Sequence, residues 1–118
     1  ADAIAMATRD IAETLDLKAI VAWTTSGTTG LRIARERPEA PVLTLTPNIS
    51  AARRLAIAWG IHAVVTEDAH DVDDMATRAA ELAATEGFAK SAERIIIVAG
   101  VPFGTPGATN MVRIAYAP

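Results

Sequence analysis

The sequence has no cysteine among its 118 residues. It therefore cannot form a disulfide framework or a zinc site with thiolate ligands. Aromatic residues make up only 4% of the chain, so large rings cannot supply most of a core. Alanine, with 26 positions, is the commonest residue in a chain that is 51% apolar. These features predict a globular domain whose core is closely packed from small and aliphatic side chains.

Long apolar runs and a basic stripe are also missing. No apolar stretch approaches the roughly 18 residues that a membrane span needs, and the start shows no signal-peptide pattern. The net charge of -3 is spread over both signs, which argues against a nucleic-acid surface. We expect a cytoplasmic protein that binds neither membrane nor nucleic acid. The chain starts at Ala1 without a methionine, so it is either a piece of a longer protein or a natural single-domain protein.

Predicted strands alternate with predicted helices along the chain, and this order predicts an α/β fold. A chain of this length forms one domain, and we expect residues 1–118 to do so. By their apolar spacing, the predicted helices are 2–15, 29–37, 48–59 and 71–86, and the predicted strands are 19–24, 42–46, 61–66, 94–99 and 111–116. This alternation favours a mostly parallel, five-stranded sheet with helices on both faces, which is a three-layer α/β/α sandwich.

The topology follows from the connections. Right-handed crossovers predict the strand order 3-2-1-4-5. No helix separates the last two strands, so the last one, 111–116, is expected to run antiparallel at an edge. An apolar edge strand invites pairing, and we predict a dimer through this edge and an adjacent helix.

Helix boundaries are predicted from capping residues. Asn48 or Ser50 is expected to cap the third helix, and Gly60 to end it in a left-handed C-terminal cap. Asp71 is expected to open the fourth helix and Gly87 to end it.

The turn after the first strand is the candidate site. In open α/β sheets, ligands bind beyond the carboxyl ends of the strands where the winding reverses, here between the first and fourth strands. The turn leads into a helix, whose free amide hydrogens and dipole attract anions. The candidate phosphate-binding residues of this turn are Thr24, Thr25, Ser26, Gly27, Thr28 and Thr29.

The loop 100–110 after the fourth strand should face this turn. Gly104, Thr105 and Gly107 would add amides and backbone freedom to the site. The alternative is that the hydroxyls merely cap helices and the glycines merely make turns, as in any α/β domain.

The remaining polar residues predict no catalysis. Ser26 is not in a nucleophile elbow, and His62 and His70 lack metal-ligand spacing. Capping and the helix dipole explain the acidic residues before and within the fourth helix, which are Glu67, Asp68, Asp71, Asp73 and Asp74. Trp23 and Trp59 are expected to be core or interface anchors, although Trp23 could also line a ligand. No nucleophile, base and oxyanion site come together, so we assign no catalytic residue and no metal site.

A series of landmarks resembles the C-terminal domain of pyruvate kinase over essentially the whole length. They are Ala3-Ile4-Ala5, Ala19-Ile20-Val21 with Thr24-x-Ser26-Gly27, Arg37-Pro38-x-Ala40-Pro41-Val42, Thr46-x-Asn48 with Ala52-Arg53, Trp59-Gly60-Ile61, Gly87-Phe88, the strand ending at Gly100, and Gly107-x-Thr109-Asn110. The resemblance implies a regulatory and assembly domain of a tetrameric glycolytic enzyme, which transfers the phosphoryl group of phosphoenolpyruvate to ADP.

The resemblance also implies where cofactors and effectors bind. In that family the catalytic lysine and the magnesium and potassium ligands lie in a separate barrel domain, so we expect no cofactor and no catalysis in this chain. In many members of the family, a sugar-phosphate effector binds between the loops that residues 24–29 and 101–108 match here, and the resemblance implies the same site in this chain. Members activated by fructose 1,6-bisphosphate hold the second phosphate with a tryptophan and an arginine, where this chain has Asp68 and Met75. This departure counts against a bisphosphate effector and leaves open a monophosphate, such as a hexose or pentose monophosphate or a nucleotide.

A second resemblance belongs to a different class. Thr24-x-Ser26-Gly27-x-Thr29 is also similar to the phosphate loop of flavodoxins, which bind FMN. The extra helix before the first strand and the shortage of aromatics to stack a flavin, with Phe103 the main candidate, count against this alternative.

Overall fold

The computed structural model describes residues 2–25, 27–57, 60–67, 69–99 and 111–118. Its elements are α1 (Asp2–Thr14), β1 (Ile20–Trp23), α2 (Thr28–Arg35), β2 (Val42–Thr46), α3 (Ile49–Leu55), β3 (Ile61–Val65), α4 (Val72–Thr85), β4 (Arg94–Ala99) and β5 (Met111–Tyr116). The sheet order β3-β2-β1-β4-β5 confirms the predicted topology. The first three pairings are parallel and the β4–β5 pairing is antiparallel, also as predicted.

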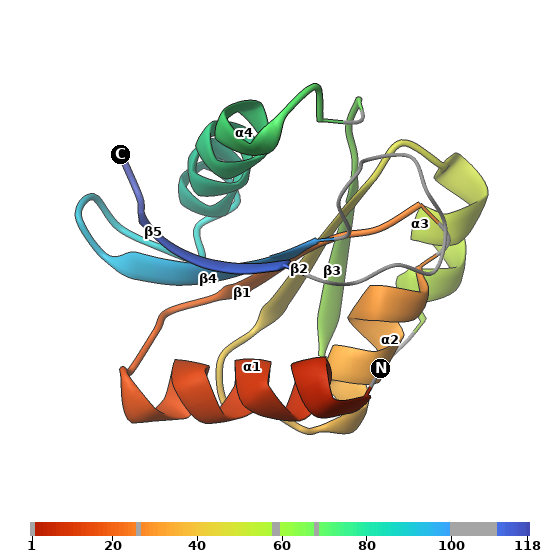
Figure 1. Ribbon diagram of the computed structural model, residues 1–118. Helices are drawn as coiled ribbons and strands as arrows, with labels where there is room; N and C mark the ends of the chain where they lie inside the picture. Colours follow the sequence, from red (N-terminus) through yellow and green to blue (C-terminus); the bar gives the residue numbers. More distant parts are fainter. Residues whose placement is uncertain (1, 26, 58–59, 68, 100–110) are drawn as a thin grey trace.

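Helices cover both faces of the sheet, with α4 on one face and α1 and α2 on the other (Figure 1). Successive strand residues point to opposite faces. In β1, Val21 and Trp23 therefore pack in the cluster beneath α4, whereas Ile20 and Ala22 pack against α1 and α2. All four β1 residues are buried, as expected of a central parallel strand. None of the helices in the described ranges is long and apolar enough to cross a membrane.

The third helix is shorter than predicted. Asn48 caps it as expected, because its side chain accepts hydrogen bonds from the amides of Ser50 and Ala51. The helix ends at Leu55, however, and Gly60 does not cap it. Gly60 is left-handed, with a φ of 79°, and its carbonyl accepts a hydrogen bond from the Val42 amide. Gly60 thus makes the turn into β3, and the predicted helix end, Trp59, lies outside the described residues.

The other helix boundaries lie close to the predicted ones. The second helix ends at Arg35, and Arg37, with a φ of 53°, turns the chain before Pro38. Asp71 caps α4 as predicted, since its side chain accepts from the Asp74 amide. Gly87 is left-handed just beyond the end of α4, with a φ of 82°.

The helix α2 packs unusually close to β2. A Cβ atom added to Gly30 would lie 2.6 Å from Thr44 Oγ1. Both residues are buried, and the Thr44 hydroxyl has no hydrogen-bond partner among the described residues. Thr44 therefore contributes packing to this contact. Glycine is needed at position 30 because any side chain there would collide with Thr44.

We predict that Gly30→Ala lowers the free energy of unfolding. Overpacking a core typically costs about 1–3 kcal/mol, which exceeds the roughly 1 kcal/mol that alanine gains over glycine in a helix. Adding Thr44→Ala should restore part of the loss, because it removes the atom that the new Cβ meets. Urea unfolding of the parent, the single and the double variant measures this. A Gly30→Ala variant as stable as the parent would show that α2 can move away from β2 without loss of stability.

Candidate functional site

The turn 24–29 lies at the carboxyl end of β1, the strand that pairs with β2 on one side and β4 on the other. It therefore occupies the predicted point where the winding reverses. The Thr24 amide donates to the Leu45 carbonyl at 3.0 Å, which extends the β1–β2 pairing by one residue. The start of the turn is thus fixed to β2.

Gly27 shapes the middle of the turn. Its φ is 93° and it is the N-cap residue of α2, so it occupies the left-handed region that glycine tolerates best. A Cβ at this position would lie 3.3 Å from the Leu55 side chain. The Gly27 amide donates to Thr24 Oγ1 at 2.9 Å. The conformation therefore favours glycine here, and a Cβ would also make a tight contact with Leu55.

The hydroxyl-bearing residues of the turn lie around this glycine. Thr24, Thr25, Thr28 and Thr29 are half-buried. Thr24 Oγ1 accepts the Gly27 hydrogen, which leaves its own hydroxyl hydrogen able to donate to an oxyanion. Thr28 and Thr29 form the first turn of α2, where the helix dipole is positive. Ser26 lies outside the described residues, so its predicted role stays a prediction.

The second predicted loop begins and ends beside the turn. Ala99, the last residue of β4, pairs with Met111, the first residue of β5. Because β4 pairs with β1 in parallel, both ends of the 100–110 segment lie at the carboxyl edge of the sheet. Gly104, Thr105 and Gly107 lie outside the described residues, and their facing the turn stays a prediction.

Two acidic residues near the start of α4 serve as caps. Asp71 Oδ1 accepts from the Asp74 amide at 2.7 Å, and Asp74 Oδ2 accepts from the His70 amide at 2.9 Å. The His70 hydrogen bond, assisted by the charge of Arg78, lowers the pKa of Asp74 from its ordinary value of 3.8. No group of three or more metal-binding side chains occurs within the described ranges. The capping interpretation of Asp71 and Asp74 is therefore confirmed.

Trp23 is a core residue at the edge of the site. Its side chain packs beneath α4, and the residue is 4% exposed. The guanidinium of Arg78 lies 5.4 Å from the centre of its ring, a cation–π distance. Arg78 also bonds the Asp74 carboxylate and the Glu67 carbonyl. Arg78 therefore ties α4 and the segment after β3 to the end of β1.

Two long-range contacts were not predicted from the sequence: that of Arg78 with Trp23 and that of His62 with Glu86. For Arg78, the sequence indicates only the local pair with Asp74, four residues earlier on the same helix. His62 Nε2 lies 2.6 Å from Glu86 Oε1, and the His62 ring meets the Phe88 ring edge-on. No local signal pairs β3 with the end of α4, so the sequence could not indicate this contact.

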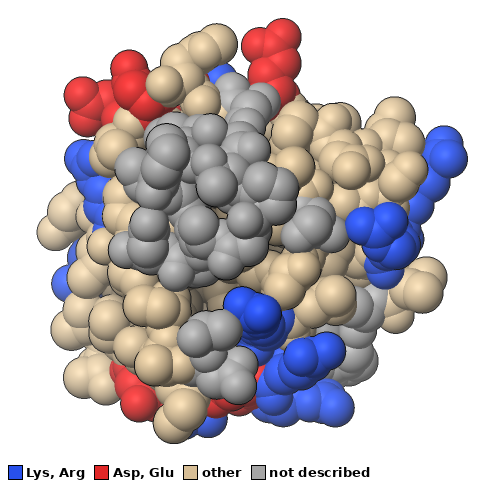
Figure 2. Space-filling view, turned by 45° about the vertical axis from the view of Figure 1, so that its right-hand side comes forward, with Lys and Arg blue, Asp and Glu red and all other residues tan. Residues whose placement is uncertain are grey.

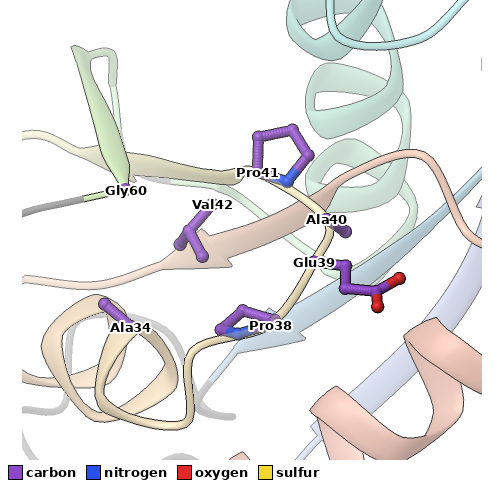
Figure 3. A pocket seen from close by; sticks show the side chains of 7 residues that line it. All are labelled: Ala34, Pro38, Glu39, Ala40, Pro41, Val42 and Gly60. Carbon is purple, nitrogen blue, oxygen red and sulfur yellow. The ribbon is translucent and has the colours of Figure 1, made fainter.

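A pocket of about 150 Å³ lies at the opposite, amino end of β2 (Figure 3). It is lined by Ala34, Pro38, Glu39, Ala40, Pro41, Val42 and Gly60. Its one charged side chain, Glu39, points away from Val42. Apolar walls and a carboxylate do not suit an anion, so this pocket does not compete with the turn as a phosphate site.

Basic side chains gather at the end of α2 and at the end of α3. Arg32 and Arg35 lie in the last turn of α2, and Arg53 and Arg54 in the last turn of α3. Figure 2 shows blue side chains on the side of the molecule that carries these two helices. The turn itself contains neither lysine nor arginine. Anion binding there would rest on hydroxyls, amides and the helix dipole.

The fold and the turn together define an α/β domain with a candidate anion site at the switch point. The sequence matches the family described as "Pyruvate kinase, alpha/beta domain" over residues 2–115. This chain therefore belongs to the pyruvate kinase alpha/beta domain family. The match supports the first resemblance and lends no support to the flavodoxin-like alternative.

Curated relatives named pyruvate kinase agree with the family match. The chain is 63% identical over 115 residues to one from Methylorubrum extorquens, covering 98% of this chain and 24% of the relative. It is 39% identical over 115 residues to one from Agrobacterium vitis, with the same coverages. A Lactococcus lactis relative is 42% identical over 113 residues, covering 96% of this chain and 22% of the relative. The chain thus spans about a quarter of the length of these relatives and corresponds to their C-terminal domain.

We predict that Asp74→Asn lowers the melting temperature at neutral pH. A carboxyl whose folded pKa is lowered stabilises the fold above its unfolded pKa, and this stability is lost as the pH falls through the folded pKa. The difference between parent and variant should therefore shrink as the pH is lowered below 3.8. Thermal unfolding against pH measures it. The exposed Glu81→Gln of the same helix is the control for loss of charge, and an equal, pH-independent loss in both variants would refute the role of Asp74.

Proposed function

We propose that this chain is the regulatory domain of a pyruvate kinase and that the turn 24–29 binds the phosphate of a small-molecule effector. The observation that carries the proposal is the Thr24–Gly27 geometry. A left-handed glycine closes the turn on a threonine hydroxyl and opens a helix at the switch point of the sheet. Helix N-termini with this backbone arrangement are established anion sites in proteins.

The two loops proposed to form the site contain no cation that would hold a second phosphate. Residues 19–31 and 95–112 contain no lysine or arginine, and the Arg78 guanidinium is bonded to Asp74 and the Glu67 carbonyl. A second phosphate group normally needs a cationic partner. The effector class that fits is a monophosphate whose remaining part is a sugar or nucleoside, in line with Asp68 and Met75 at the positions noted above.

We propose that the parent protein transfers a phosphoryl group between phosphoenolpyruvate and ADP in the cytoplasm, as the resemblance to the pyruvate kinase family implies. Phosphoryl transfer needs positioned metal ions and a cationic clamp. We place those groups, with magnesium and potassium, in the part of the parent that this sequence does not include. The isolated 118-residue chain is expected to bind the effector without catalysing the reaction.

We predict that a Ser26→Ala, Thr29→Ala double variant loses phosphate-ester binding while keeping its fold. Each hydrogen bond to a charged oxyanion contributes on the order of 1.5–3 kcal/mol, so two lost donors should weaken binding beyond detection. Calorimetric titration with glucose 6-phosphate, ribose 5-phosphate and AMP measures this. The matched control is Thr77→Ala, Thr85→Ala, which removes two exposed hydroxyls from α4.

Gly27→Val should do more than the double variant. It puts a β-branched residue at a φ of 93° and against Leu55, so it should lower both binding and stability. Equal affinities in the parent and the Ser26, Thr29 variant would place the anion elsewhere and leave the hydroxyls as helix caps.

The same proposal includes assembly through β5. This strand pairs only with β4 in the described sheet, and its Ile114 and Tyr116 side chains are 42% and 66% exposed. An edge strand with exposed apolar side chains favours pairing with another chain. We propose a symmetric dimer through this edge and an adjacent helix, which would form part of the tetramer of the parent enzyme.

We predict that Ile114→Lys shifts the chain from dimer to monomer, because a charge at a paired edge opposes association. Sedimentation equilibrium over a range of protein concentrations measures the change. Ile57→Lys is the control, since Ile57 is 89% exposed but lies beyond α3 and away from β5. A parent chain that is strictly monomeric at high concentration would contradict the dimer.

A further inference from the structure

Thr46 connects the candidate turn to the neighbouring strand. It is the last residue of β2 and is fully buried, at 0% exposure. Its hydroxyl donates to the Thr25 carbonyl at 3.4 Å and accepts from the Asn48 amide at 3.1 Å. Its own carbonyl accepts from the Thr66 amide at 2.9 Å. One buried side chain therefore bonds the turn after β1 and the turn after β2 at the same time.

We propose that Thr46 is the positioning residue that holds the turn 24–29 in its anion-binding conformation. The proposal rests on the proposed function of the turn. The Asn48 amide occupies an acceptor site of the Thr46 hydroxyl and so directs its hydrogen toward Thr25. A hydrogen bond to the Thr25 carbonyl also restricts the rotation of the Thr25 backbone.

The contact lies next to the part of the turn that would meet an anion. Thr24 and Thr25 precede Gly27, whose amide closes back onto Thr24 Oγ1. With the Thr24 amide held by Leu45 and the Thr25 carbonyl held by Thr46, both sides of the entry to the turn are bonded to β2. Binding then requires less ordering of the turn, which is the advantage of a preorganised site.

Thr44 offers a matched comparison within the same strand. It lies two residues earlier on the same face of β2 and is equally buried, at 0% exposure. Its hydroxyl has no hydrogen-bond partner in the described part of the chain. A comparison of the two threonines therefore distinguishes a packing role, at Thr44, from a positioning role, at Thr46, for two equally buried residues.

The test compares Thr46→Val, Thr46→Ser and Thr44→Val in titrations with inorganic phosphate. The Thr46→Val change removes a neutral hydrogen bond, so it should weaken phosphate binding about three- to tenfold. The serine variant keeps the hydroxyl and should bind like the parent, as should Thr44→Val. If Thr46→Val does not fold, Thr46→Ala against Thr46→Ser gives the same comparison.

Amide hydrogen exchange without any ligand separates this inference from the proposed function. In Thr46→Val, the Gly27 and Asn48 amides should exchange faster than in the parent, while in Thr44→Val both should be unchanged. If the parent binds no phosphate but the exchange result holds, the proposed function fails and the positioning role stands. Unchanged Gly27 exchange in Thr46→Val, or equal effects in Thr44→Val, would overturn the inference.

Discussion

The β1 strand pairs with β2 and β4 at once, and the register of the β1–β2 pair places Trp23 opposite Leu45. This register also positions the residues that follow Trp23 and Leu45. The Thr24 amide donates to the Leu45 carbonyl, and the Thr46 hydroxyl donates to the Thr25 carbonyl. A shift of one residue would turn every β1 side chain to the wrong face. Because both faces of β1 are buried, that shift is strongly opposed, and the geometry of the turn depends on this register.

Hydroxyl groups near β1 and β2 have three different uses. The Thr24 hydroxyl closes the turn onto Gly27, and the Thr46 hydroxyl bonds the turn to β2. The Thr44 hydroxyl packs against Gly30 without a hydrogen-bond partner among the described residues. The same residue type therefore shapes a loop, joins two segments or fills space according to its neighbours. In the proposed function, only hydroxyls at the turn would meet the effector, while Thr46 would act through Thr25.

The sheet order could be predicted because it follows from local patterns: three strand–helix units and a final pair of strands with no helix between them. The end of α3 could not be predicted, because a left-handed glycine such as Gly60 can either end a helix or make the turn into a strand. The Gly60–Val42 hydrogen bond, between distant segments, decides the case. The location of the turn was predictable for the same reason as the sheet. The roles of Thr46 and Arg78 were not, since each depends on partners brought together only by the folded sheet.

The most direct test of the account is a nuclear magnetic resonance titration of the ¹⁵N-labelled chain with a sugar monophosphate, following every backbone amide. We expect the amides of Thr25, Gly27, Thr28 and Thr29 to shift together and to saturate at one affinity. Shifts confined to the arginine-bearing end of α2, at Arg32 and Arg35, would contradict binding at the turn. They would show that exposed cations, and not the turn at the switch point, bind the phosphate.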